Sequence, residues 1–514
     1  MMRYSLCASI LLLATAASAA DDAKGPQLNA VKATFKYSSD EGKTYALDAL
    51  PDLPSAGRVS VFGRAEITVD DPAKIGMLWL TTVRDSGGLC PVNDRAIGPK
   101  YVCNSPVLLN AKVQLNGKDV PPQLPDMLVL RWAIDPALLV KGPNVITFSG
   151  QGWNALVNCG SSEKVPLAFR LQSTAPDAPA LRSGPALGPL GDEYFTLAAR
   201  TWIPCEMKVT VTPTEPAGAA ATHTGPREIL HKLRIPLPKG TRKFTYAIEA
   251  GASKAGPWTV RVPDEKTLRF VVLGQTATGS GVAGLLKAKA ALEKVDPDFI
   301  VHTGSLVLMS YWDFAWDDCL FAPWGDLLAH VPMVGVPAYR DLYSSAFLNF
   351  LYHPSADGNW AQWTWTAGPV RFIGLDGWSA AANAAATAKW VEDVLKDAKE
   401  PYVFDITSYP AYTTNAFGRG IAGHNYDKET VQPLLAKYKA TASLGCTGKY
   451  EYIPAPNANA VDTLITGGVG APMAPGWNKY NYVIFQIKDG KCSVQAVAYE
   501  TGEVLDRRTF EPRK

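Results

Sequence analysis

From Thr267 onward, short apolar runs alternate with amphipathic segments, and few folds accommodate this alternation. The apolar runs show no alternation with polar residues, so they suit strands that are buried on both faces. They are LRFVVLG, FIVHTG, VPMVGV, VRFIGLDG and YVFDIT. The spacing of apolar residues between them predicts helices in VAGLLKAKAALEK, FAPWGDLLAH, AATAKWVEDVLKDAK and KETVQPLLAKY. Together they predict an α/β domain whose functional loops follow the carboxyl ends of its strands.

The N-terminal part of the chain has the pattern of an all-β domain. Residues 28 to about 170 contain short alternating segments that are punctuated by Gly, Pro, Asn and Asp, which predicts a β-sandwich or jelly roll. The stretch KVQLNGKDV followed by WAIDPALLVKGPNVITFSG resembles galactose-binding-like jelly rolls, with a hairpin, a one-turn helix and then a strand. We expect this domain to cover residues 21–172.

A stretch rich in Pro, Ala and Gly, residues 173–191, predicts a linker. The strand patterns after it end near Pro263, and their spacing predicts an immunoglobulin-like or fibronectin-like sandwich over residues 178–263. The α/β domain then covers residues 266–514. Within it, the segments after Val461 predict a return to antiparallel strands.

Residues 1–20 have the pattern of a cleaved export signal. Arg3 precedes the apolar run CASILLLATAA, which ends in small residues just before Asp21. No other segment approaches the ~20 uninterrupted apolar residues that a membrane helix needs. We therefore expect a secreted or periplasmic protein with no transmembrane segment. The net charge of +2 gives no reason to expect a nucleic-acid partner.

Export permits disulfide bonds. The chain has 8 cysteines, and Cys7 lies in the signal, so 8 − 1 = 7 remain. Because seven is odd, at least one thiol is free or pairs between chains. We expect a disulfide between Cys90 and Cys103, which flank a loop rich in Pro, Gly and Asn.

The order and spacing of the strand ends resemble the calcineurin-like metallophosphoesterases, especially the purple acid phosphatase branch. The resemblance covers residues 178–510 and includes a fibronectin-like domain directly before the α/β domain, as in that branch. It implies a four-layer fold in which helices flank a β-sandwich. The matching segments are FVVLG (270–274), HTG (302–304), VGVP (334–337), VRFIGLDG (370–377) and TGGVGAP (466–472).

Family chemistry uses two divalent cations, held by Asp, Asn and His, that activate a water molecule. At the matching positions this sequence has Gln275 and Ser305 for two Asp ligands, Tyr339 and Arg340 for the Asn ligand and the catalytic His, Ser408 for the His of the His-x-Pro motif, and Cys446 and Gly448 for two further His ligands. Asp341 retains the family acid that lies beside the catalytic His without binding metal. These departures from the pattern of the resembled family therefore predict that the protein holds no metal cofactor.

The leading hypothesis is a catalytically inactive phosphoesterase-like protein with a binding or structural role. The positive charge of Arg340 would repel cations by several kcal/mol at ~4 Å and intermediate dielectric. Arg340 could instead hold an anion such as phosphate or sulfate, or it could pair with Asp341 or extend into solvent. The sequence identifies no partner beyond a candidate anionic or carbohydrate ligand.

Two alternatives stay open. A hydrolase with metal-independent chemistry would need a nucleophile and a base, and the candidates are Ser305, Ser408, Cys446, Asp341 and Asp405, with His424 as a base that could reach them. No spacing assembles a catalytic triad, and His302 fits a core position. A carbohydrate-binding protein would use the N-terminal sandwich, with Trp132 and Trp153 as candidates.

The acidic stretch YWDFAWDDC contains three carboxylates that could be considered as metal ligands: Asp313, Asp317 and Asp318. The aromatic residues between them match a core-facing helix stripe. We therefore predict a solvated helix start rather than a metal site.

Overall fold

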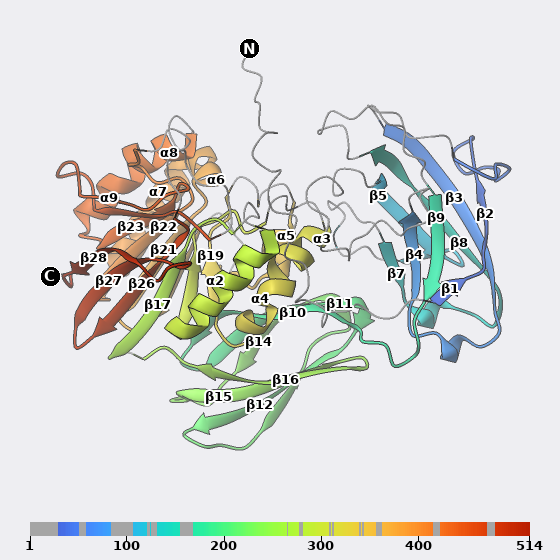
Figure 1. The fold of residues 1–514 in the computed structure, drawn as a ribbon, viewed down its shortest axis with the longest axis horizontal. Coiled ribbons are helices and arrows are strands. Elements are labelled where there is room, and N and C mark those ends of the chain that lie inside the picture. The colour runs from blue at the N-terminus through green and yellow to red at the C-terminus, as the bar shows by residue number, and fades with distance from the viewer. Residues whose placement is uncertain are drawn as a thin grey trace, which may run out of the picture. The chain divides into compact units, whose positions relative to one another are not determined.

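The computed structural model describes residues 29–50, 58–83, 106–120, 124, 131–154, 168–264, 266–276, 281–307, 310, 313–338, 341, 344–355, 362–414, 422–469 and 479–513. The expected export signal and the pair Cys90–Cys103 lie outside these residues and stay predictions. The chain forms two compact units, Met1–Ala178 and Pro179–Lys514, each drawn in Figure 1.

The first unit consists of antiparallel sheets, as predicted. One has the order β1 (Asn29–Val31), β9 (Ala168–Ser173), β4 (Leu78–Val83) and β7 (Arg131–Ile134); the other has the order β2 (Thr34–Tyr37), β3 (Arg58–Val69), β8 (Gly142–Asn154), β5 (Pro106–Leu115) and β6 (Lys118–Val120). The one-turn 3-10 helices η1 (Pro72–Lys74) and η2 (Pro136–Leu138) lie between strands. The sheets face each other through Phe148 and Phe169, whose ring centroids are 4.4 Å apart.

Trp132 belongs to the core of this unit, because only 4% of its surface is exposed. An aromatic platform for sugars needs an exposed ring face, so Trp132 does not supply one. The side chain of Trp153, the other candidate, lies outside the described part of the chain.

The second unit begins with a small sandwich. One of its sheets has the order β10 (Leu181–Gly191), β11 (Tyr194–Cys205) and β14 (Glu228–Pro236). The other has the order β13 (Ala221–Thr224), β12 (Met207–Glu215), β15 (Lys243–Ala250) and β16 (Ser253–Arg261). The predicted linker over 173–191 is wrong for its second half, since that half is strand β10. Leu187 and Leu190 are buried in the sandwich core, and shifts of register against β11 absorb the Gly and Pro residues.

Two larger sheets follow the sandwich. The first has the order β19 (Met333–Gly335), β18 (Phe299–His302), β17 (Thr267–Leu273), β26 (Asn481–Lys488), β27 (Lys491–Ala498) and β28 (Val504–Phe510). The second has the order β20 (Gln362–Ala367), β21 (Val370–Leu375), β22 (Tyr402–Thr407), β23 (Ala442–Cys446), β25 (Thr463–Thr466) and β24 (Glu451–Ile453). The sheets pack through Phe270 against Phe372, at 5.3 Å between centroids, and Phe485 against Phe404, at 5.2 Å.

The predicted strands after Thr267 are confirmed, with one correction. β17 to β19 run parallel, as do β21, β22 and β23. β25 was predicted to be antiparallel, but it pairs in parallel with β23. The chain first forms the edge strand β24 and then returns between β24 and β23, so β25 has one parallel and one antiparallel neighbour.

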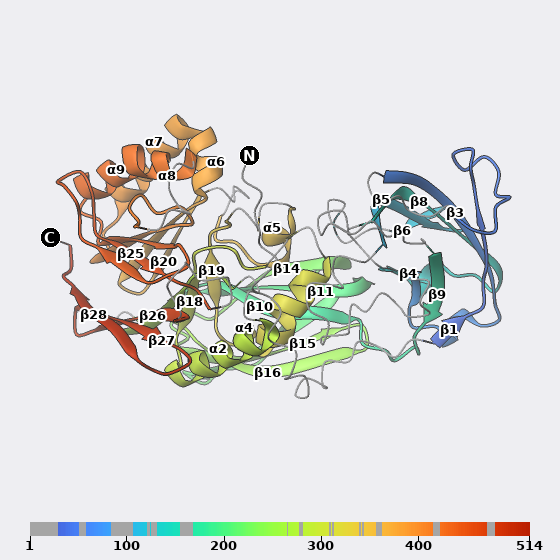
Figure 2. The ribbon, with the colours of Figure 1, turned by 45° about the horizontal axis from the view of Figure 1, so that its top comes forward.

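Helices lie beside the two sheets (Figures 1 and 2). They are α2 (Gly281–Val295), α3 (Asp313–Trp316), α4 (Ala322–Leu328), α5 (Ala346–Phe350), α6 (Gly377–Ala382), α7 (Ala384–Asp397), α8 (Ala422–Tyr426) and α9 (Gln432–Lys437), with the π-helical turns η4 (Asp317–Phe321) and η7 (Asp427–Val431). The helices from α6 to α9 cover one face of the second sheet, where Val391 and Leu435 pack with Val403 in one apolar cluster. No helix in the described ranges is long and apolar enough to cross a membrane.

The prediction of a solvated helix start is wrong for Asp317. Its carboxylate binds the guanidinium groups of Arg182, at 2.6 Å, and of Arg200, whose side chains are only 5% and 1% exposed. Both arginines come from the small sandwich, so local periodicity could not indicate them. Asp317 therefore fastens the sandwich to the α/β layers.

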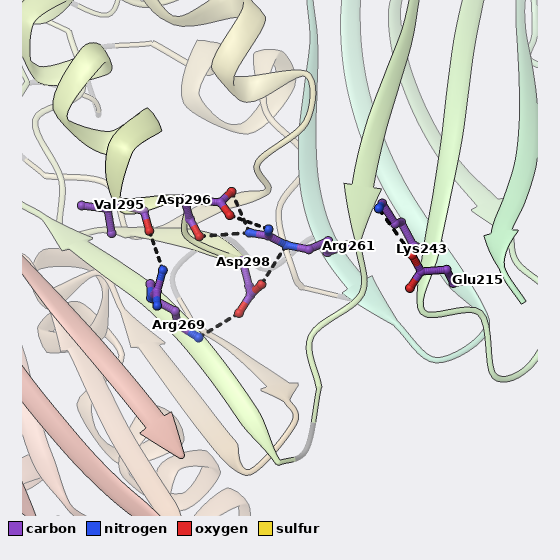
Figure 3. A network of polar contacts seen from close by, with 7 residues as sticks. All are labelled: Glu215, Lys243, Arg261, Arg269, Val295, Asp296 and Asp298. Atoms are coloured by element: carbon purple, nitrogen blue, oxygen red, sulfur yellow. Dashed lines mark hydrogen bonds and ion pairs between the residues drawn. The ribbon is translucent and has the colours of Figure 1, made fainter.

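Further polar contacts join the sandwich to the rest of the second unit. The hydroxyl of Tyr246 donates to the carbonyl oxygen of Ala329 at 2.6 Å. Figure 3 shows Arg261 of β16 between Asp296 and Asp298, at 2.6 and 3.2 Å. These contacts hold the sandwich on the same unit that carries the candidate site.

Candidate functional site

The carboxyl ends of strands from both large sheets meet at one place. The thiol of Cys446, at the end of β23, donates to the carbonyl oxygen of Thr303, just after β18, at 3.5 Å. The amide of Val469, beyond β25, donates to the carbonyl oxygen of Gln275, beyond β17, at 3.0 Å. Predicted site residues from different strands are therefore brought together.

Glycines allow this close approach of backbones. Gly468 has φ +82°, and a Cβ there would lie 2.5 Å from the carbonyl oxygen of Gln275. A Cβ on Gly274 would lie 2.9 Å from the amide nitrogen of Gly468 and 3.0 Å from the Cβ of Cys446. Side chains at these two positions would push the sheet ends apart.

The carboxylate of Asp341 is completely buried at this site and accepts backbone amides through both oxygens. Oδ2 accepts from Ser305 at 2.6 Å and from Ala338 at 3.0 Å, while Oδ1 accepts from Leu306 at 2.9 Å and Val307 at 3.5 Å. Burial raises its pKa to about 6, although these amides favour the charged form and oppose that rise.

The backbone after β18 is shaped to present these amides. Gly304 and Ser305 have φ values of +103° and +57°, in the left-handed region that L-residues seldom adopt. Successive amides in such a turn point inward and form an anion-binding nest. In this protein the carboxylate of Asp341 fills the nest.

His302 is a core residue, as predicted, and both ring nitrogens are engaged. The amide of Gly304 donates to Nδ1 at 3.0 Å, so Nε2 carries the proton and donates to Thr276 Oγ1 at 3.1 Å. Burial lowers the pKa of His302 to about 3. The ring therefore stays neutral and gives Ser305 no free base.

Cys446 and Ser408 are buried side chains at the strand ends. Cys446 is 4% exposed, and burial raises the pKa of its thiol to about 11. A thiol with a raised pKa is a poor nucleophile at neutral pH. Ser408 is 7% exposed, and its hydroxyl has no hydrogen-bond partner within the described ranges. Gly448 has φ +85° in the turn between β23 and β24.

Cys446 should resist alkylation in the native protein. We expect iodoacetamide at mildly alkaline pH to leave Cys446 unmodified until a denaturant is added, because the thiol is both buried and protonated. Peptide mass spectrometry of native and denatured samples measures this, with Cys492, which is also fully buried, as an internal reference. Rapid native labelling of Cys446 alone would show an accessible thiolate.

The remaining candidates do not all reach this place. Tyr339 and Arg340 lie outside the described residues. Asp405 lies inside β22, with its Oδ2 accepting from Ser443 Oγ at 2.8 Å, so it is not at a strand end. His424 Nδ1 donates to the carbonyl oxygen of Pro410 at 2.7 Å and thus contacts the loop after β22.

The sequence did not reveal the Asp341 nest or the contact between His302 and Thr276. The left-handed turn at Gly304-Ser305 was the one local signal, since Gly after a buried strand marks such turns. Asp427 carries no such signal, because an acid just before a predicted helix fits an ordinary cap.

The described residues at the strand ends do not fit a pair of divalent cations. Such cations need several carboxylate or imidazole ligands together. In the described part of the chain, no group of three or more His, Cys, Asp or Glu residues is placed to hold a metal ion. Asp341 gives its oxygens to amides, and Gln275, Ser305 and Ser408 are neutral.

No family model matches the sequence, and no curated protein matches it. A purple acid phosphatase from yellow lupin (Lupinus luteus) seeds is a structural neighbour with TM-score 0.57 and 13% identity, covering 90% of this chain and 95% of that one. The chain therefore has a fold similar to that of a purple acid phosphatase.

More distant neighbours cover 48% of this chain each. GAP50, the anchor in the inner membrane complex of Plasmodium, has TM-score 0.39 and 16% identity over 90% of its own chain. A predicted phosphoesterase from Streptococcus pneumoniae has TM-score 0.24 and 10% identity over 98% of its chain. At these scores neither carries an argument about this protein.

Proposed function

We propose that this protein is a phosphoesterase-like protein without phosphoesterase activity, and that its α/β layers serve a binding or structural role. The fold similarity to a purple acid phosphatase supports the phosphoesterase-like part of the proposal, and the strand ends are where a fold of this kind carries its functional loops. The observation that chiefly supports the proposal is the Asp341 carboxylate, whose two oxygens are taken up by backbone amides.

The neighbouring side chains support the same conclusion. A metal-dependent phosphoesterase needs activated water and charge neutralisation of the phosphoryl oxygens. Gln275 and Ser305 stand at two positions where the resembled family has carboxylates, and neither carries charge. Cys446 is protonated at neutral pH because burial raises its pKa. These groups cannot balance two divalent cations.

The purified protein should hold no stoichiometric divalent metal and should not hydrolyse p-nitrophenyl phosphate at acid or neutral pH. Elemental analysis and the chromogenic assay test this together. The double variant Gln275→Asp/Ser305→Asp should stay inactive, because Tyr339, Ser408, Cys446 and Gly448 still replace the Asn and His ligands of the resembled family. About two metal ions per chain together with turnover by the wild type would refute the proposal.

The contacts at the site weigh against a metal-independent hydrolase. Nucleophilic Ser or Cys needs a base within hydrogen-bond reach. His302 is neutral with both nitrogens engaged, and His424 uses Nδ1 on Pro410. We therefore favour a binding role over new catalysis in this fold.

The proposal extends to the ligand and the setting of the protein. Arg340, at the position of the family's catalytic His, is our candidate for holding an anion. We assign residues 21–172 to a galactose-binding-like sandwich, 178–263 to a fibronectin-like domain and 266–514 to a metallophosphoesterase-like domain. Residues 1–20 support export to the periplasm or the exterior.

A further inference from the structure

A row of polar side chains crosses the second sheet, away from the strand-end site. Asp405 of β22 is paired in register with Ser443 of β23, and Ser443 is paired with Thr463 of β25. Residues paired in this way project from the same face of a sheet. Val403, two residues before Asp405, lies in the apolar cluster under the helices, so the row faces the helices. All three polar residues are completely buried.

Asp427 and Gln432 face this row from the helix layer. Asp427 begins η7 and is 3% exposed, and Gln432 begins α9 and is fully buried. Tyr426 and Val431, from the segment that carries Asp427, pack in the same apolar cluster as Val403 of β22. After burial itself, the carboxylate of Asp405 adds to the rise in the pKa of Asp427. The Gln432 amide lowers the pKa of Asp427 from nearby without completing a hydrogen bond.

Several polar atoms of this cluster lack partners among the described residues. They are Oδ1 of Asp405, Oδ1 of Asp427, Nε2 of Gln432 and Oγ1 of Thr463. Buried polar atoms are normally hydrogen-bonded, and an exception calls for an explanation. In the described ranges neither carboxylate forms an ion pair with Lys or Arg. The cluster is therefore acidic, buried and not neutralised by side-chain cations.

The acid pair also holds the loop that carries Ser408. Asp427 Oδ2 accepts the amide of Ala411 at 2.7 Å, and His424, on the preceding helix α8, donates to the carbonyl oxygen of Pro410 at 2.7 Å. The segment formed by α8 and η7 is thus fastened to residues 408–411. A change in the charge of Asp427 therefore acts directly on its contact with the Ala411 amide.

A retained proton, rather than a metal ion, suits this acid pair. Two unneutralised carboxylates cannot both stay charged in a low-dielectric interior. The Oε1 atom of Gln432 accepts the amide of Val461 at 3.1 Å, which leaves its NH₂ group, a donor, to face the acids. A donor beside the two acids favours a carboxyl pair and disfavours a cation.

We infer that Asp405 and Asp427 form a proton-dependent lock. While the pair retains a proton at neutral pH, it holds the α8–η7 segment and the loop 408–411 against the second sheet. When the proton leaves for solvent at higher pH, two like charges face each other and the segment loosens. The lock thereby links the pH of the surroundings to the position of a loop at the strand-end site.

The direction of the pH effect follows from the raised pKa values. Burial raises the pKa of Asp405 to about 7 and that of Asp427 well above its ordinary value. The native protein therefore binds protons that the unfolded chain has already lost. This stabilisation is complete below the unfolded pKa and disappears as the pH rises through the folded values.

Other ionisable groups also lie around the pair. Tyr426 and Tyr412 lie near Asp427, and burial raises their pKa values, that of Tyr426 to about 12. Asp376 caps α6 through the amide of Ser379. Lys428 is exposed on η7.

Urea unfolding of the full chain between about pH 6.5 and 8.5 tests the lock. This window lies above the pKa of Asp341 and above those of the buried histidines 231, 302 and 353. For each proton that only the native state holds, the unfolding equilibrium constant should rise about tenfold per pH unit. Asp405→Asn and Asp427→Asn should each reduce this slope, and the double variant should abolish it. Asp393→Asn, which removes an exposed acid from an ion pair with Lys389, should leave the slope unchanged.

Hydrogen exchange gives an independent readout of the loop. In the wild type, the Ala411 amide should lose protection as the pH rises, relative to amides within β22. In Asp427→Asn it should show no such change, because the side-chain oxygen of the Asn still accepts this amide. Equal slopes in wild type and double variant would overturn the inference. Stabilisation by calcium chloride that needs Asp405 would overturn it as well, since it would assign the pair to a cation site.

Discussion

Asp317→Asn is expected to destabilise the second unit by about 3 kcal/mol, because it removes a carboxylate that two buried guanidinium groups share. Arg200 is completely buried, its Nε donates to Ser183 Oγ at 2.6 Å, and its guanidinium lies 3.9 Å from the ring centroid of Phe350. Arg182 binds the same carboxylate. Urea unfolding at neutral pH measures the loss.

The matched control for this prediction is Asp393→Asn, which removes an acid from the exposed ion pair with Lys389. Exposed pairs contribute about 0–1 kcal/mol, so this variant should stay close to the wild type. Similar small losses from both variants would mean that Asp317 does not hold the sandwich to the α/β layers.

Asp341→Ala should cost the protein about 3 kcal/mol of unfolding free energy or more at neutral pH. The substitution leaves the buried amides of Ser305, Leu306 and Ala338 without their acceptor, and a buried donor without a partner costs about 1–3 kcal/mol. Relief from burying a charged carboxylate, whose pKa burial raises to about 6, offsets part of this loss.

Asp341→Asn is the matched comparison, because its single carbonyl oxygen can keep the amides of Ser305 and Ala338, which share one oxygen in the wild type. It should therefore lose less stability than Asp341→Ala when both are unfolded in urea. If the two variants were equally stable, the nest would not depend on an acceptor at this position.

The place of the candidate site could be predicted from the sequence, but its chemistry could be predicted only in part. Buried strands followed by Gly mark strand ends wherever helices alternate with them. The structure brings the backbones of Gln275 and Ser305 and the thiol of Cys446 into one network of contacts at these ends. Asp405 was assigned to the same group because distance along a strand does not show which face a side chain occupies. The register with Ser443 places it under the helices instead.

Local patterns in the sequence determined the strands and helices of this protein, because backbone period and side-chain burial are properties of neighbouring residues. Only the tertiary structure decided which distant groups meet. It made residues 181–191 a core strand, gave Asp317 its two arginines, aimed four amides at Asp341 and joined Asp427 to the amide of Ala411. Each of these outcomes depends on desolvation and on contacts between residues far apart in the chain, and these exist only after the layers have packed.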